Sequence, residues 1–243
     1  MSGSGKLIGV GIGPGDPELL TLKAVRALRT AHVIAHFAKA GRTGHARGVV
    51  AEHVQAGAEE LPLHYPVTTE IGKETPEYRT LIRSFFDASA AAVASRLDAG
   101  RTVAVLSLGD PLFYGSYMHL HVRLASRYPT EVIAGVTGMS GCWSSVGTPI
   151  AQGDDVLGVI PATLPEPELA RRMRDIDAAV VMKLGRHLPK VRRVLEQAGR
   201  LERAIYVERG TLPGATAMRL ADKRDDQAPY FALVLVPGWE GQA

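Results

Sequence analysis

Cysteine is almost absent from this 243-residue chain, which contains only Cys142. An internal disulfide is therefore impossible, and a zinc site built on cysteines is not expected. No apolar run reaches the roughly 18 residues that a membrane-spanning helix needs, and no basic, apolar and small-residue leader stands at the N-terminus. We therefore expect a cytoplasmic protein with no membrane partner.

Aromatic residues are also scarce, at 6%, and the formal net charge is only +3. Proteins that bind nucleic acid typically combine a strongly basic surface with stacking aromatic side chains. We therefore expect no nucleic-acid partner. Hydrophobic residues make up 46% of the chain, which is enough for a substantial core in one large domain or two smaller ones, and we expect two.

The sequence shows none of the side-chain sets that carry hydrolytic or metal chemistry. There is no Ser/His/Asp set and no paired-carboxylate motif, and His32 and His36, four residues apart in a predicted strand, have no third metal ligand. The dinucleotide-binding spacing also fails, because the third position counted from Gly11 is Asp16. No acidic residue that could bind a ribose occurs in residues 19–51, so a nicotinamide-dependent oxidoreductase is disfavoured.

The clearest positive signal is an apolar run at residues 102–107 that leads through Leu108 into Gly109, Asp110 and Pro111. A short run of branched aliphatic residues bounded by turn residues is typical of a strand buried on both faces of a parallel sheet. Gly109 permits close approach of a ligand, and Pro111 ends the strand pairing. Since open α/β sheets bind ligands at the carboxyl ends of their strands, we predict a small-molecule cofactor at this loop.

A second glycine-rich turn follows a predicted strand at residues 7–12, and there Asp16 is placed as a helix N-cap with Pro17 in the first turn. Strands and helices then alternate, which predicts a mainly parallel sheet. The expected elements are strands at residues 32–36, 102–107 and 131–134, an irregular or edge segment at 61–69, and helices at 49–56, from 75 to Gly100, and beyond Gly115.

The second half of the chain predicts a different domain. Strands are expected at residues 156–160, 178–184, 204–208, 215–220 and 230–236, with helices near 167–175 and 188–197. The last strands follow one another without a helix, which favours an antiparallel meander. The predicted fold class is thus α/β with two α/β domains: a mainly parallel sheet in residues 1–127 and a mixed sheet in 128–243, with the division itself anywhere from 117 to 140.

Three segments resemble the signatures of the tetrapyrrole methylases, which are S-adenosylmethionine-dependent enzymes of cobalamin and sirohaem synthesis. They are residues 11–23, Gly109-Asp110-Pro111 with Tyr114-Gly115, and residues 135–137. Within this family, residues 39–75, Lys183 and residues 229–233 are similar to the branch that methylates precorrin-2 at C20. The likeness covers nearly the whole chain.

The resemblance implies S-adenosylmethionine as the cofactor, S-adenosylhomocysteine as its product, a tetrapyrrole such as precorrin-2 as the substrate, and a homodimer without a metal. It implies two domains with the cofactor in the cleft between them. The implied cofactor-binding residues are Pro14, Leu108, Gly109, Asp110, Phe113, Thr137, Gly138, Leu184, Tyr206, Val207, Phe231 and Ala232.

Methyl transfer from a sulfonium is an in-line displacement, for which positioning supplies most of the acceleration, and this agrees with the absence of a nucleophilic set. If the methylated carbon must lose a proton, Asp110 and Tyr230 are the expected catalytic groups. Asp110 is equally suited to cap a turn, and Tyr230 to pack on a strand. Arginine candidates for the substrate carboxylates are Arg42, Arg47, Arg79, Arg83 and Arg123.

Other functions stay open at this point. One is another ring methylase, acting on uroporphyrinogen III or on cobalt-precorrin-2. The related ribosomal RNA 2′-O-methyltransferase is disfavoured by the few aromatic residues and the small net charge. A non-catalytic tetrapyrrole carrier belongs to a different class of protein, and it would bind the macrocycle without any dependence on S-adenosylmethionine.

Overall fold

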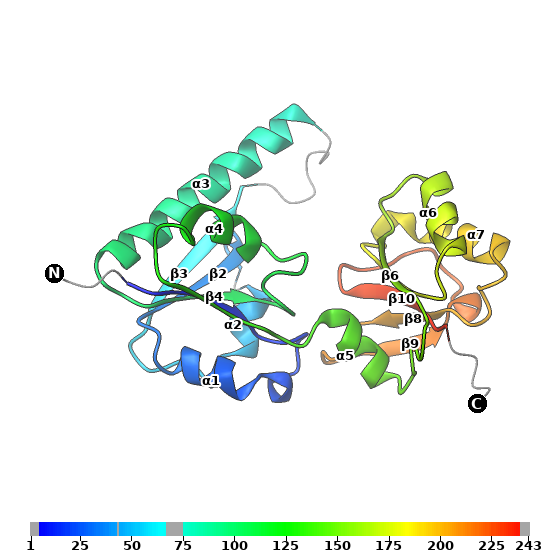
Figure 1. Cartoon of the computed structure of the whole chain (residues 1–243), viewed down its shortest axis with the longest axis horizontal. Helices are drawn as coiled ribbons and strands as arrows, with labels where there is room; N and C mark the ends of the chain where they lie inside the picture. The colour runs from blue at the N-terminus through cyan, green and yellow to red at the C-terminus, as the bar shows by residue number, and fades with distance from the viewer. Residues whose placement is uncertain (1–4, 43, 67–74, 239–243) are drawn as a thin grey trace. The chain divides into compact units, whose positions relative to one another are not determined.

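The computed structural model describes residues 5–42, 44–66 and 75–238, and the chain forms two compact units that divide between Thr137 and Gly138 (Figure 1). The strand at Thr130–Ile133 pairs in the sheet of the first unit, which is why the division follows it. Within the described residues, no helix has both the length and the apolar character needed to cross a bilayer.

The N-terminal unit is built on a five-stranded sheet of order β3-β2-β4-β1-β5, in which all neighbouring strands are parallel, as the alternation predicts. Its strands are β1 (Leu7–Gly11), β2 (Val33–Lys39), β3 (Glu59–Tyr65), β4 (Val103–Ser107) and β5 (Thr130–Ile133). The predicted central strand is confirmed, because β4 lies between β2 and β1 and all five of its residues are buried. Pro62 lies on the edge strand β3, where the pairing tolerates it.

Helices cover both faces of this sheet. On one face α3 (Pro76–Asp98) and α4 (Tyr117–Leu124) pack against the apolar side chains of β4 and β1, and α1 (Leu22–Leu28) and α2 (His45–Val49) cover the other (Figure 1). The loops after β1 and β2 therefore lead to one face, while the loop after β4 leads to the other. A reversal of this kind between neighbouring parallel strands marks the position at which open α/β sheets bind ligands.

Two local predictions in this unit differ from the structure. The helix expected at residues 49–56 instead occupies His45–Val49, because Ala46 packs into the apolar core under α2. The segment expected to be irregular or an edge at 61–69 is strand β3 as far as Tyr65, and residues 67–69 lie outside the described residues. The Asp16 cap is confirmed: its side chain accepts a hydrogen bond from the Glu18 amide at 2.9 Å.

The C-terminal unit has a mixed sheet of order β6-β7-β10-β8-β9, as predicted. Its strands are β6 (Leu157–Pro161), β7 (Ala178–Met182), β8 (Ile205–Glu208), β9 (Thr216–Arg219) and β10 (Ala232–Val236). The expected meander is wrong, because β10 lies between β7 and β8. The reason is burial: β10 is entirely apolar and buried and so takes the centre, whereas all four residues of β9 are exposed and take the edge.

Helices α6 (Glu166–Arg174) and α7 (Leu188–Gln197) pack on one face of the C-terminal sheet, near their expected positions. The other face is covered by α5 (Gly138–Ser145), through Cys142 and neighbouring apolar side chains. The sequence did not predict α5, since its glycines and serines have weak helix propensity. Tertiary packing of Cys142 and Trp143 stabilises it instead.

Candidate functional site

The glycine-rich loops after β1, β4 and β5 meet backbone to backbone at the carboxyl edge of the N-terminal sheet. A Cβ atom at Gly135 would overlap the carbonyl oxygen of Gly109 and lie 2.8 Å from the Cα of Gly11. Conversely, a Cβ at Gly11 would lie 2.5 Å from the Gly135 nitrogen. Three segments that are far apart in the sequence thus come together because none of these positions carries a side chain.

Hydrogen bonds hold the loop after β1 against the loop after β4. The Gly109 amide donates to the Gly13 carbonyl at 2.8 Å, and the Ile12 amide donates to the Ser107 carbonyl at 3.0 Å. Both Gly13 and Gly109 have positive φ angles, of 75° and 71°, which side-chain-bearing residues rarely adopt. The two turns are therefore fixed relative to each other by backbone contacts alone.

Asp110 connects the loop after β4 to the loop after β5. Its Oδ1 accepts a hydrogen bond from the Leu112 amide at 2.9 Å, and its Oδ2 accepts one from the Gly135 amide at 3.2 Å. Each carboxylate oxygen thus has a backbone donor, which is the turn-capping role that the sequence allows for this residue. The carboxylate also places a negative charge beside the converging glycines.

The segment after Asp110 exposes apolar side chains at this edge. Leu112 is 47% exposed and Tyr114 50% exposed, and the Phe113 and Tyr114 rings meet edge to face at 4.8 Å. Tyr114 has a φ of 53°, which costs energy for a residue with a side chain. Strained backbone and exposed apolar groups beside a glycine cluster are typical of a ligand site.

The other predicted residues of the N-terminal unit lie around this cluster. Leu108 and Phe113 belong to the loop after β4, Pro14 to the turn after β1, and Thr137 follows Gly135 by two residues; all four are half-buried. Gly9, inside β1, is required for packing, because a Cβ there would overlap the Tyr117 ring. Burial raises the pKa of Tyr117 to about 12, so its hydroxyl stays protonated near neutral pH.

In the C-terminal unit, the predicted residues gather at one edge of the mixed sheet. Leu184 follows the end of β7, Phe231 and Ala232 stand at the start of β10, and Tyr206 and Val207 lie in β8. Leu184, Tyr206 and Val207 are each only 1% exposed and Ala232 is 8% exposed. These four side chains fill the core, and Tyr206 and Val207 also pair with strands on both sides, so these residues shape the end of the sheet and expose no side chain to a ligand.

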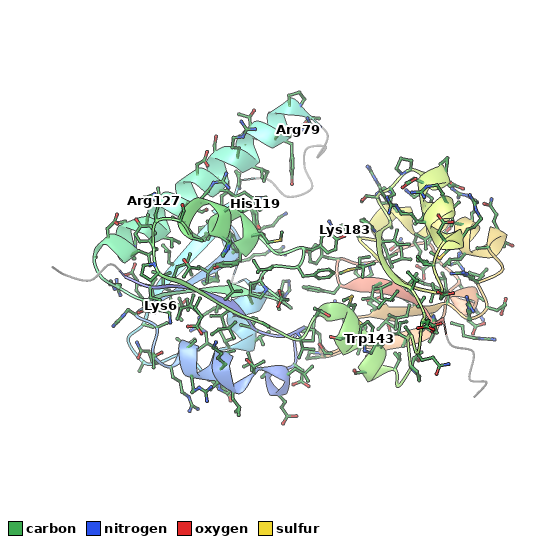
Figure 2. All side chains as sticks on the ribbon, viewed as in Figure 1. Lys6, Arg79, His119, Arg127, Trp143 and Lys183 are labelled. Atoms are coloured by element: carbon green, nitrogen blue, oxygen red, sulfur yellow. The ribbon has the colours of Figure 1, made fainter. Side chains whose placement is uncertain are left out.

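Two residues at the same edge have a left-handed backbone conformation that the sequence did not predict. Lys183 directly follows β7 with a φ of 59°, and Arg209 directly follows β8 with a φ of 55° (Lys183 is labelled in Figure 2). The Arg209 amide donates to the Phe231 carbonyl at 2.8 Å, which ties the ends of β8 and β10 together. No sequence signal predicts a left-handed lysine or arginine, because tertiary contacts impose the conformation.

Tyr230 lies just before β10 and is 90% exposed, with its ring edge to face against Phe231 at 5.0 Å. The alternative role for Tyr230, packing of its side chain on the strand, is therefore not found. Gly138 opens α5, and a Cβ there would meet no atom within 4 Å, so space is open beside its backbone.

The arginine candidates fall into three groups. Arg42 and Arg47 line a pocket beside α2, and Arg79 and Arg83 are exposed on α3, with Arg79 in its first turn (Figure 2). Arg123 on α4 is paired with Asp87 of α3 at 2.8 Å. Across residues 5–42, 44–66 and 75–238, no group of three or more histidine, cysteine or acidic side chains is arranged to hold a metal ion.

Comparison with known sequences gives matches along nearly the whole chain. The sequence profile of the tetrapyrrole (corrin/porphyrin) methylases matches residues 6–221. A Sinorhizobium protein named precorrin-2 C(20)-methyltransferase is 64% identical over 98% of this chain and 97% of its own length. A Salmonella typhimurium protein named cobalt-precorrin-2 C(20)-methyltransferase is 31% identical over 98% of each chain.

Solved structures share the fold. A uroporphyrin-III C-methyl transferase from Thermus thermophilus, crystallised with S-adenyl homocysteine, superposes with a TM-score of 0.65 at 25% sequence identity. The match covers 96% of this chain and 97% of that one, so it includes both units.

Proposed function

The chain belongs to the tetrapyrrole (corrin/porphyrin) methylases, and from this premise we propose that it transfers a methyl group from S-adenosylmethionine to C20 of precorrin-2, giving precorrin-3A in cobalamin biosynthesis. The observation that carries the proposal is the 64% identity to a protein of that name over nearly the full length of both chains. The convergence of the three motif loops in one place supports it.

The residues present suit a cofactor that is held mainly by backbone groups. At the N-terminal edge, Gly109 and Gly135 leave no side chain in the way, and the carboxylate of Asp110 is the charged group beside them. At the C-terminal edge, the left-handed turn at Lys183 lies beyond the paired residues of β7, and Phe231 lies just before β10. These edges match an adenosine and a zwitterionic methionine end better than they match a phosphate, for which clustered cations are typical.

We assign the cofactor-holding role to residues 108–110 and 137–138 and, in the C-terminal unit, to residues 184, 206–207 and 231–232. Pro14 and Phe113 shape the N-terminal edge. When bound, S-adenosylmethionine supplies an electrophilic methyl group on a sulfonium sulfur. The contribution of this chain is then to orient the two reactants and to exclude water, which together account for large rate accelerations.

A proton that leaves the methylated carbon needs an acceptor, and we propose Asp110 or Tyr230 for this role. Asp110 already accepts two backbone hydrogen bonds, from Leu112 and Gly135, so both of its carboxylate oxygens have structural partners. Tyr230 is free to meet a substrate, because its side chain is almost fully exposed. A Tyr230→Phe variant separates the two: reduced turnover with unchanged substrate affinity assigns the proton transfer to Tyr230.

The decisive experiment incubates the protein with methyl-labelled S-adenosylmethionine and precorrin-2 and locates the label by carbon NMR. Label at C20 supports the proposal, and label at another ring carbon contradicts it. Parallel reactions with cobalt-precorrin-2 and uroporphyrinogen III test the two alternative substrates. Binding of the macrocycle without any transfer of label would indicate a carrier instead.

We further propose that the protein works as a homodimer in the cytoplasm. The exposed edge strand β9, whose four residues all face solvent in the single chain, offers unpaired backbone groups to a second copy. Light scattering coupled to size-exclusion chromatography tests the oligomeric state, and cell fractionation tests the location. A monomer at micromolar concentration would contradict the first proposal.

A further inference from the structure

A pocket lies on the α2 face of the N-terminal sheet, outside the glycine cluster. It arises because the strand β3 is covered on one face only: Leu61 and Leu63 are buried against α3, whereas Glu60, Pro62 and His64 point to the other face and are exposed. Helix α2 is only five residues long and leaves that face open. The pocket has a volume of about 650 Å³ and is lined by His36, Gly41, Arg42, Arg47, Gly48, Ala51, Glu60, Pro62 and His64.

The charges of this pocket do not cancel. Arg47 donates from Nε to Glu60 Oε1 at 2.8 Å, so these two residues neutralise each other. Arg42 forms no ion pair with any residue that the structure describes, and it is exposed at the pocket. Two histidines add to this excess whenever they are protonated. The pocket therefore carries a positive charge that suits an anion, and the planar guanidinium of Arg42 favours a carboxylate.

His36 is the buried polar group of the pocket, at 6% exposure. Its Nε2 lies 3.5 Å from Glu60 Oε2, and its Nδ1 has no hydrogen-bond partner among the described residues. The Nδ1 atom lies 3.3 Å from the position that a Cβ would take at Gly44, so a side chain there would press on the ring. A buried nitrogen without a partner is uncommon in native proteins, and this one lies on the Gly44 side of the ring.

One side of the pocket is formed by the turn after β2, at the same end of the sheet as the loops that carry the family motifs. Gly41 and Arg42 belong to the turn that begins where β2 ends, and β2 is the neighbour of β4, whose loop contains Gly109. Neighbouring strands are about 4.8 Å apart, so these turns emerge side by side at the carboxyl edge of the sheet. A substrate with several acidic side chains can place one of them here while its ring is held elsewhere.

We propose that this pocket binds a carboxylate side chain of the tetrapyrrole substrate, with Arg42 as its charged contact and the His36 ring in its wall. The inference rests on the proposed function. Burial lowers the pKa of His36, as do the nearby Arg47 and His64, whereas Glu60 raises it. A bound carboxylate favours the protonated imidazole, so substrate affinity increases as the pH falls toward 6.

The test compares Arg42→Gln with Arg29→Gln, a control on the exposed end of α1, in the methyl-transfer assay. Loss of a charge-assisted hydrogen bond predicts a KM for the tetrapyrrole that is about tenfold higher in R42Q, with kcat and the Kd for S-adenosylmethionine unchanged. R29Q keeps the KM of the natural protein. If R42Q is active and its KM is unchanged, the inference is overturned while the proposed function stands. Failure of the natural protein to methylate any tetrapyrrole overturns the proposed function, and the inference with it.

A second measurement uses glutarate as a small dicarboxylate probe and follows the histidine ring signals by NMR. We expect the His36 signals to shift on titration in the natural protein and in R29Q but not in R42Q. No shift at millimolar glutarate contradicts an anion site at His36. A shift combined with an unchanged KM in R42Q means that the pocket binds free anions independently of the substrate, which also overturns the inference.

Discussion

The two units present candidate binding edges that are built in opposite ways. The N-terminal edge depends on missing side chains, because Gly11, Gly109 and Gly135 touch through their backbones. The C-terminal edge is formed by residues with long side chains, Lys183 and Arg209, whose backbones are held in the left-handed region. In both cases a backbone conformation that most side-chain-bearing residues disfavour stands just beyond the end of a strand.

This difference shows which kind of site a sequence reveals. A glycine cluster is visible in the sequence, because the requirement for glycine is a property of each position. A left-handed lysine is not visible, because the surrounding fold supplies the energy that holds it. The predictions below change each edge in turn and begin with the largest expected effect.

The largest effect is expected from Gly135→Ala. The new methyl group would overlap the Gly109 carbonyl oxygen, so the loops after β4 and β5 must separate. We expect a loss of about 3 kcal/mol in the free energy of unfolding, and a loss of methyl transfer of about 100-fold from displaced loops. Urea denaturation and the labelled-methyl assay measure the two quantities.

Gly48→Ala is the matched control for stability, since a Cβ at Gly48 would meet nothing within 4 Å. We expect no loss of unfolding free energy, and a gain of up to about 1 kcal/mol, because alanine favours a helix more than glycine does and Gly48 lies in α2. Equal unfolding free energies for Gly135→Ala and Gly48→Ala would show that the loops do not depend on close backbone approach.

A smaller effect is expected from Asp110→Asn. The amide keeps one acceptor oxygen but turns its NH₂ group toward either the Leu112 or the Gly135 amide, so one backbone hydrogen bond is lost. We expect a decrease of about 1–2 kcal/mol in stability, together with weaker binding of S-adenosylmethionine by calorimetry. Reduced turnover with unchanged stability and cofactor affinity would instead assign Asp110 to proton transfer.

At the C-terminal edge, we expect Arg209→Gly to be more stable than Arg209→Ala by about 1 kcal/mol, because alanine retains the cost of a positive φ and glycine does not. At an ordinary position in regular secondary structure, the alanine variant would instead be the more stable of the two. Thermal unfolding of the two variants measures the difference. A more stable alanine variant would mean that Arg209 is not held in a strained conformation.

The smallest effect concerns Glu131, which ties β5 to its surroundings. Its carboxylate accepts from Lys23 at 2.5 Å and from Lys6 at 2.6 Å, and these hydrogen bonds lower the pKa of Glu131 to about 2. A lowered pKa in the folded state stabilises the protein above the unfolded value of 4.5, and this contribution is lost as the pH falls through about 2.

For this partly exposed group we expect Glu131→Gln to lower stability by only about 1 kcal/mol at pH 7, and the difference from the natural protein to disappear near pH 2. Glu202→Gln is the control in the C-terminal unit, because Glu202 is exposed and lies 3.9 Å from Arg219; its effect is expected to be negligible. A difference between Glu131→Gln and the natural protein that persists at pH 2 would contradict the ion-pair explanation.

Much of the N-terminal site could be predicted from the sequence. The central position of β4, the Asp16 cap and the two glycine-rich turns follow from short stretches of sequence, and the structure brings Gly109 and Gly135 into contact. The fold class and the family could be predicted for the same reason. The double hydrogen bond of Asp110 could not, since its second donor is 25 residues away along the chain.

In the C-terminal unit, the sequence predicted where strands lie but not which of the expected site residues have buried side chains. Leu184 and Tyr206 are core residues whose side chains point into the packed interior. Family likeness predicts that they lie near the cofactor, and the structure shows that their side chains fill the core. Only the pattern of burial, which depends on the assembled sheet, distinguishes a side-chain contact from a backbone contact.

By itself, the sequence determined the alternation of strands and helices, the parallel N-terminal sheet and the glycine positions, because each depends on the conformational preferences of a few adjacent residues. The tertiary structure alone decided that β10 lies between β7 and β8, that Lys183 and Arg209 are left-handed, and that Arg42 and His36 share a pocket. These features depend on contacts between distant segments, whose energies exceed local preferences once the core is packed.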